Sequence, residues 1–198
     1  MDAIDLRVAH RVFRLDNEQL AFRYTATVSD RAGAAFDRLT DAARLRLWLA
    51  ANGLDPGRDI TATEVARARE LREAIYRTGA AIARTRPPDA PDLFAINSAA
   101  AAGSPAPTLA DGRVEWHLVG GDRLVDALAV IAGDAITALG TYPPQRIKLC
   151  EGDGCSGLFV DASRGSSRRW CSMGTCGNRE KKRRTRDPRS PQGAGVQP

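Results

Sequence analysis

The sequence predicts an α+β fold: a mainly helical N-terminal domain with short antiparallel strands, followed by a small C-terminal module. Two observations support this prediction. In the body of the chain, apolar residues recur at three- and four-residue steps, which is typical of helices packed on a core. The last fifty or so of the 198 residues are instead rich in Gly, Ser and Arg. They hold few large apolar groups, so this module needs another source of stability.

An alternating pattern predicts strands near the N-terminus. From Leu20 to Val28 the side chains alternate between apolar and polar types, as in a half-buried strand. Asp16 and Asn17 are turn-forming residues in front of this segment. Residues 7–15 and 19–28 are therefore expected to pair as a hairpin.

Two helices are predicted next. The first begins after a cap at Thr40 and stops at Asn52, which precedes a glycine. Thr61 and Glu64 form a capping-box pattern in front of the second. This is the clearest helical periodicity in the chain, and it continues until Pro87.

The rest of the body is predicted to contain a third helix, a hairpin and a last helix. The third helix covers residues 91–102, and its inward-facing side chains are expected to be Leu93, Phe94 and Ile96. The hairpin turns at Asp111. The last helix covers residues 122–139 and is apolar nearly all round, which predicts a central, buried position.

Composition divides the chain into an N-terminal domain (1–142), a small module (146–188) and a tail (189–198). A Thr-Tyr-Pro-Pro sequence marks the first boundary. The tail is rich in Gly, Pro and Gln, and we expect it to be disordered.

The net charge of +5 is distributed unevenly. Between residues 164 and 189, ten basic residues face two acidic ones, whereas the rest of the chain is net negative. A near-neutral body with a strongly basic end indicates an anionic partner, with nucleic acid ahead of a membrane or a heparin-like polymer.

The N-terminus is acidic and lacks the apolar run of a signal peptide. No stretch approaches the roughly 18 consecutive apolar residues of a membrane span. We therefore expect a cytoplasmic protein that does not bind membranes and whose thiols stay reduced.

All four cysteines of the chain lie within one short segment: Cys150, Cys155, Cys171 and Cys176. The two Cys-x4-Cys pairs can supply tetrahedral thiolate coordination to one structural zinc ion. Five nearby glycines are expected to allow the positive φ of the two turns. Residues 158–160 read as a strand between the pairs, so the module is predicted to be treble-clef-like, with the second turn opening a helix. Folding of this module should then depend on metal.

Other interpretations of the cysteines remain open. Two disulfides would suit a secreted chain, and an iron–sulfur cluster also uses four thiolates. Catalytic zinc needs an open coordination position, which four cysteines would close.

The residues around the second cysteine pair resemble a known family. The Ser-Arg-Arg-Trp-Cys-Ser-Met run at 167–173 and the Cys-Gly-Asn-Arg tetrapeptide at 176–179 match the signature of the CGNR zinc finger. In that family the finger usually follows an ABATE domain, described as a stress-induced transcription regulator. The N-terminal part is similar in layout, although Ala26-Thr27 stands where the family tends to have Asn-Thr. The resemblance implies DNA binding.

Residues 177–186 are predicted to form a basic helix, since nothing breaks a helix between Gly177 and Pro188. Two sets of cations are expected to contact phosphate, each contact steepening the salt dependence of binding. The helix set comprises Lys181, Lys182, Arg183, Arg184 and Arg186, and the loop set comprises Arg164, Arg168 and Arg169.

Asn178 and Arg179 are candidates for base-edge contacts, because Asn pairs with adenine and Arg with guanine. The alternative is structural: Asn178 would cap the turn, and Arg179 would offset the charge of the thiolate cluster. The whole basic segment could also be a disordered extension without a defined target.

The leading functional hypothesis is a DNA-binding transcription regulator, not an enzyme. Its N-terminal domain would sense a small-molecule effector or support a homodimer. An RNA- or ribosome-associated protein is the alternative, followed by an enzyme with its site in the N-terminal domain. No nucleophile elbow, paired carboxylates or metal-catalysis motif favours the enzyme.

Overall fold

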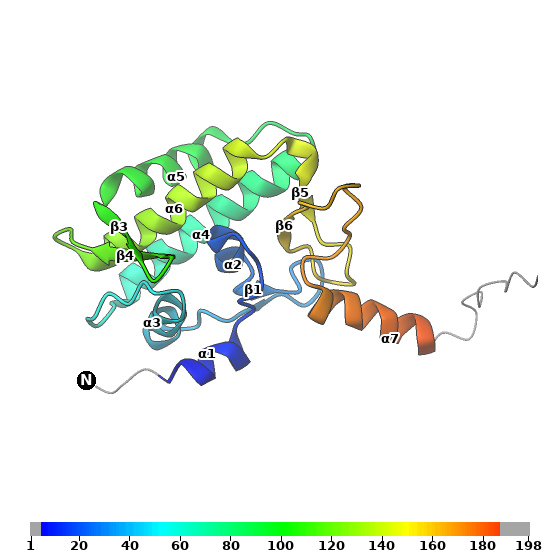
Figure 1. Ribbon diagram of the computed structural model, residues 1–198, viewed down its shortest axis with the longest axis horizontal. Coiled ribbons are helices and arrows are strands. Elements are labelled where there is room, and N and C mark those ends of the chain that lie inside the picture. The colour runs from blue at the N-terminus through cyan, green and yellow to red at the C-terminus, as the bar shows by residue number, and fades with distance from the viewer. Residues whose placement is uncertain (1–4, 187–198) are drawn as a thin grey trace, which may run out of the picture.

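The computed structural model describes residues 5–186, and its helices form a body from which the last helix projects at one end (Figure 1). The tail predicted at 189–198 lies outside these residues. In chain order the elements are α1 (Leu6–Val12), α2 (Leu20–Thr25), β1 (Val28–Ser29), β2 (Phe36–Asp37), α3 (Ala42–Ala51), α4 (Ala62–Ala83), α5 (Ala90–Ala102), β3 (Pro105–Ala110), β4 (Arg113–Leu118), α6 (Arg123–Thr141), η1 (Pro144–Arg146), β5 (Ile147–Leu149), β6 (Leu158–Val160), η2 (Met173–Gly177) and α7 (Asn178–Arg186).

The core lies where α4, α5 and α6 pack side by side, with α2 set against α4 and α6 (Figure 1). Trp48 and Tyr24 are fully buried there, with ring centroids 4.9 Å apart. The Tyr24 hydroxyl donates to the carbonyl of Ala68 at 2.7 Å, so its burial leaves no unsatisfied hydroxyl. This arrangement confirms the predicted α+β fold with a mainly helical N-terminal part.

The capping box predicted for the long helix is present at the start of α4. Thr61 Oγ1 accepts from the amide of Glu64 at 3.3 Å, and Glu64 Oε2 accepts from the amide of Thr61 at 2.7 Å. Arg58 donates to the other Glu64 oxygen at 2.7 Å. These bonds satisfy amides that the first helical turn leaves free.

The N-terminal hairpin prediction is wrong, because residues 7–15 and 19–28 contain α1 and α2. Helix α2 is short and buried on most sides, so alternation along it does not report one exposed face. Its amides are capped by a distant residue: the Asp134 carboxylate of α6 accepts from Ala21 N at 2.7 Å. A cap 113 residues away in sequence leaves no local signal.

Helix α5 is present, but it buries a different face from the one predicted. Ile96 is buried as expected, whereas Phe94 is 75% exposed and Leu93 is 39% exposed. The buried face instead carries Asp92, whose carboxylate accepts two bonds from Arg77 of α4 at 2.9 and 2.5 Å. This charge pair sets the rotation of α5 against α4.

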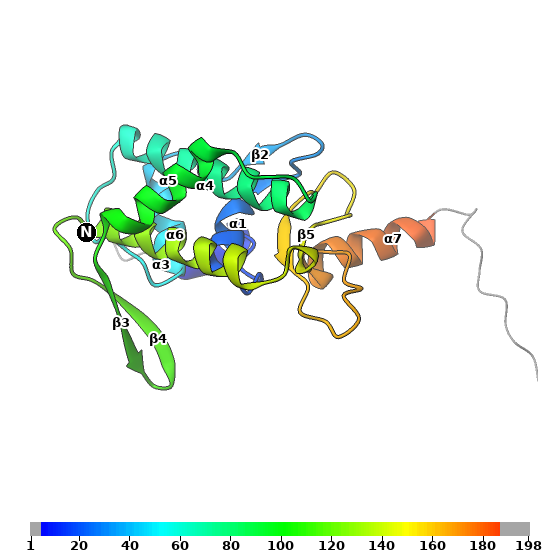
Figure 2. The ribbon, with the colours of Figure 1, turned by 90° about the horizontal axis from the view of Figure 1, so that it is seen from above.

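The strands form three separate antiparallel pairs. β3 and β4 pair from Pro105–Leu118 to Ala110–Arg113, which confirms the predicted hairpin, and they project from the body (Figure 2). β5 and β6 pair with Leu149 opposite Leu158. Ile147, Leu158 and Val160 from this pair belong to the same buried cluster as the helices, so the cysteine-rich unit shares the main core.

Helix α6 has the length and apolar content of a membrane-crossing helix, although it contains no run of about 18 consecutive apolar residues. Half of this apolar stretch is buried inside the fold. The core helices of soluble proteins pass the same test, so this is weak evidence for a membrane span.

Candidate metal centre and nucleic-acid interface

Four sulfur atoms gather at the end of the molecule where α7 begins. Cys150 follows β5, Cys155 lies in the turn before β6, and Cys176 lies in the π-helical turn η2. Cys171 comes from the preceding loop. The Cys155 sulfur is 3.8 Å from that of Cys171 and 3.5 Å from that of Cys176. All four sulfurs lie within 4.8 Å of one another.

This spacing fits one tetrahedral zinc ion. Zinc–sulfur bonds of about 2.3 Å place tetrahedral ligands about 3.8 Å apart, which matches the sulfur separations. The cysteines are free, and their sulfurs are too far apart for the roughly 2.05 Å of a disulfide bond. The cluster is therefore a structural zinc site, as predicted.

The four thiols compete with one another for negative charge. Hydrogen bonds with Cys150, Cys171 and Cys176 lower the pKa of Cys155. Hydrogen bonding to Cys150 and Cys155 raises the pKa of Cys171 and of Cys176. A dication among the sulfurs would remove this conflict, because it favours the thiolate form of every ligand.

The glycines around the first pair contribute in different ways. Only Gly154 among the five has a positive φ, of 70°, so the conformational reason predicted for the others is wrong. Gly152 has little space for a side chain: a Cβ there would lie 3.1 Å from Cys176 Cβ and 3.3 Å from Cys150 Sγ. The Gly152 amide also points at the Cys150 sulfur at 3.4 Å.

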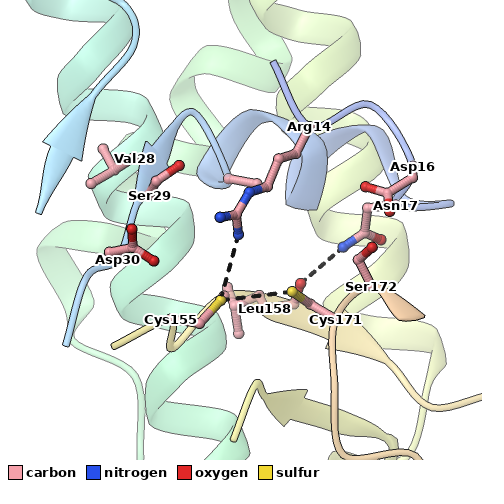
Figure 3. A pocket seen from close by; sticks show the side chains of 12 residues that line it. Arg14, Asp16, Asn17, Val28, Ser29, Asp30, Cys155, Leu158, Cys171 and Ser172 are labelled. Atoms are coloured by element: carbon pink, nitrogen blue, oxygen red, sulfur yellow. Dashed lines mark hydrogen bonds between the residues drawn. The ribbon is translucent and has the colours of Figure 1, made fainter. Parts of the chain in front are cut away.

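An arginine from the N-terminal part contacts the cluster, and sequence reasoning missed it. Arg14 Nη1 lies 3.7 Å from Cys155 Sγ (Figure 3) and 3.9 Å from Cys176 Sγ. Burial opposes the charge on Arg14, but Cys155 and Cys176 outweigh it and raise its pKa. Arg14 thus offsets the thiolate charge, the role considered for Arg179. Nothing local distinguishes Arg14 from the many other arginines of the chain.

The cysteine-rich unit is bound to the body through its own backbone. The Cys155 carbonyl accepts from Arg31 N at 3.2 Å, and the Gly154 carbonyl accepts from Ala32 N at 3.0 Å. Asn17 Nδ2 donates to the Leu158 carbonyl at 2.9 Å. The first two bonds hold the first cysteine turn against the segment that follows β1, and the third holds the start of β6 against the segment before α2.

A small pocket lies beside the cluster, between Arg14, Asn17 and Asp30 on one side and Cys155 and Cys171 on the other (Figure 3). Its volume of about 20 Å³ is enough for about one water molecule. A small-molecule effector needs about 300 Å³ or more, so this pocket is not a ligand site of that size.

The loop between β6 and Cys171 is organised by Asp161, which is fully buried. Its carboxylate accepts from Lys148 Nζ at 2.6 Å and from the amides of Ser163 and Arg168 at 3.0 and 2.9 Å. Burial opposes ionisation of Asp161, but these bonds outweigh it and hold its pKa below the usual range.

The three loop arginines predicted to contact phosphate differ in their surroundings. Arg168 turns inward: it donates to the carbonyls of Trp170 and Cys171 at 2.9 and 2.6 Å and lies over the Phe159 ring. Arg169 is half exposed and pairs with Glu151 at 2.5 Å. Arg164 is exposed.

Helix α7 carries the predicted cations and starts directly at the second cysteine pair. Asn178 Nδ2 donates to the Gly174 carbonyl at 3.1 Å, and Arg179 pairs with Asp30 at 3.2 Å. Both therefore have structural partners. Glu180 pairs with Arg183 and Arg184 at 2.9 and 3.1 Å.

Lys181 and Lys182 are exposed, and within residues 5–186 neither has an ion pair. Arg186 ends the helix. Helix α7 projects from the body along most of its length (Figure 1).

Comparison with protein families gives two matches in the order of the chain. The family ABATE, described as "Putative stress-induced transcription regulator", matches residues 18–142, more than half of the chain. The chain belongs to the ABATE family. The CGNR zinc finger matches residues 146–189, which include all four cysteines. Both resemblances suggested by the sequence are thus confirmed, and both families are of regulator or zinc-finger type, not enzyme families. No curated protein matches the chain.

Proposed function

We propose that this ABATE-family protein is a transcription regulator that binds duplex DNA through helix α7, with the zinc centre fixing that helix to the body. The observation that carries the proposal is that the cysteine cluster and the basic helix α7 are directly connected. Cys176 lies in the turn η2, which continues directly into α7. A bound metal would hold the cations of α7 at a set angle to the body.

The charge on α7 supports a polyanionic partner. Six of its nine residues are cationic and only Glu180 is acidic. Lys181 and Lys182 are the leading phosphate contacts, joined by Arg183, Arg184 and Arg186 on the same helix. Arg164 and Arg169 are proposed to reach the backbone from the neighbouring loop. Arg168 is proposed to act through loop structure, because its guanidinium bonds to carbonyls of its own loop.

Direct base reading by Asn178 and Arg179 would require these side chains to leave their present partners. Arg179 is half exposed and its bond to Asp30 is at the surface, where ion pairs contribute little. Little free energy is therefore lost when Arg179 leaves Asp30 for a base or a phosphate. Of the two residues, Arg179 is the better candidate for a DNA contact.

The N-terminal domain is proposed to act as a dimerisation or sensor module. Exposed apolar side chains on α5 and on the β3–β4 hairpin favour dimerisation, chiefly Phe94, Leu109 and Val114. Sedimentation of the zinc-loaded protein tests this: a dimer that Leu109→Asp converts to a monomer supports dimerisation, and a monomer at all concentrations refutes it.

DNA binding is tested by fluorescence anisotropy with a labelled duplex over a salt series. Zinc-loaded wild type should show a slope of log K against log salt of about −0.9 per phosphate contacted. The variant with Cys171→Ser and Cys176→Ser should bind much more weakly. Equal, weak binding by both proteins would mean that α7 acts as unstructured charge. Tighter binding to an RNA duplex of the same sequence would support the RNA-associated alternative.

A further inference from the structure

A groove lined by arginines runs beside α1 toward the start of α7. Its inner part is lined by residues 10–16, Arg38, Thr175 and Arg179. Its outer part is lined by residues of α1 and of the segment 36–44, including Arg11, Arg38 and Arg44. Arg11, Val12 and Arg38 line both parts, so the groove is continuous.

The groove carries an excess of positive charge. No acidic side chain lines its outer part, and Asp16 is the acidic residue of the inner part. Within the described part of the chain, neither Arg11 nor Arg44 forms an ion pair. The nearby Asp41 is engaged as the cap of α3, where it accepts from Arg44 N at 2.9 Å and from Thr40 Oγ1 at 2.8 Å.

The central arginine of the groove is held in place. Arg38 donates from Nη1 to the Val12 carbonyl at 2.9 Å and from Nε to Ser29 Oγ at 3.0 Å. Its guanidinium lies 5.3 Å from the ring of the exposed Phe36. Burial and the nearby charges of Arg14 and Arg44 lower the pKa of Arg38, so an anion in the groove would relieve a repulsion between like charges.

We propose that this groove is a second DNA-contacting surface, which binds the phosphate backbone of the duplex that α7 engages. The proposal rests on the proposed function of α7. The two surfaces are joined by Arg179, which belongs to α7 and also lines the inner part of the groove. Figure 1 shows α1 and α7 on the same side of the body, so one duplex can lie against both.

The test uses the full, zinc-loaded chain, a labelled DNA duplex and three double variants. The groove variant is Arg11→Ala with Arg44→Ala. The helix variant is Lys181→Ala with Lys182→Ala. The control is Arg67→Ala with Arg86→Ala, which removes the same charge from exposed arginines outside the groove. Circular dichroism melting checks that the fold of each is retained.

The groove variant is expected to reduce the magnitude of the salt slope by about 1.8, from two lost contacts of about 0.9 each, and the helix variant by a similar amount. The control should leave the slope unchanged. If the helix variant weakens binding while the groove variant behaves like the control, the groove proposal is overturned and the function of α7 stands. If the helix variant also behaves like the control, the proposed function fails, and the groove proposal fails with it.

Discussion

Replacing Leu158 with alanine should destabilise the helical body, although Leu158 belongs to the cysteine-rich unit. Leu158 is 1% exposed, and its methyl groups lie directly against α4 at Gly79. A Cβ on Gly79 would be only 2.7 Å from Leu158 Cδ1 and 3.5 Å from Leu139 Cδ2 of α6. Removing this side chain leaves a cavity beside α4 and α6, and the surrounding structure relaxes only partly around such a cavity. Such substitutions cost about 2–5 kcal/mol, and we expect about 3 kcal/mol here.

Urea unfolding of the zinc-loaded protein measures this cost in two ways. Circular dichroism follows the helices, and a chromophoric chelator follows zinc release. With a urea slope of about 3 kcal/mol/M, Leu158→Ala should lower both midpoints by about 1 M. Leu6→Ala is the matched control: Leu6 is 47% exposed and lies on α1, not on α5 or the β3–β4 hairpin, so its loss should change stability by no more than about 0.5 kcal/mol. If Leu158→Ala lowered the urea midpoint for zinc release but left the midpoint for helix unfolding unchanged, the shared core would be refuted.

Three further predictions concern the zinc contact, the zinc itself and pH. Arg14→Ala should weaken zinc affinity by about tenfold or more, because Arg14 contacts the metal ligands. Competition with a chelator measures this affinity, and an unchanged value would exclude a role for Arg14 at the metal centre. Chelating zinc should increase hydrogen exchange at the amides of Arg31 and Ala32, which bond to the first cysteine turn, and persistent protection would show that this turn forms without metal. Hydrogen bonds from Arg58 and from the Thr61 amide lower the pKa of Glu64 to about 2. Its stabilising effect is therefore present above about pH 4.5 and is lost as the pH falls toward 2. Glu64→Gln keeps the capping box but removes the charge that pairs with Arg58, so it should cost no more than about 1 kcal/mol near neutral pH. Its difference from wild type in urea unfolding should shrink below pH 4.5, and a constant difference would contradict the ionised cap.

Features whose causes are local in the chain could be predicted from the sequence. The four cysteines lie in one short segment, and ligand type and spacing alone indicate a single tetrahedral zinc. The capping box at Thr61 involves residues three positions apart. The charge on α7 is likewise a property of consecutive residues. Each of these predictions needed no knowledge of the partners across the fold.

Tertiary packing decided the features whose causes are distant in sequence. Helix α2 takes its cap from Asp134, so the alternating pattern of its residues wrongly predicted a strand. Helix α5 turns Asp92 inward to meet Arg77, so its apolar residues wrongly predicted which face is buried. Arg14 reaches sulfurs more than 140 positions later in the chain, and Arg11 and Arg44 come together with the start of α7 only in the folded chain. A single sequence specifies which side chains are charged or apolar. Which of them meet is fixed by burial and charge pairing in the folded core.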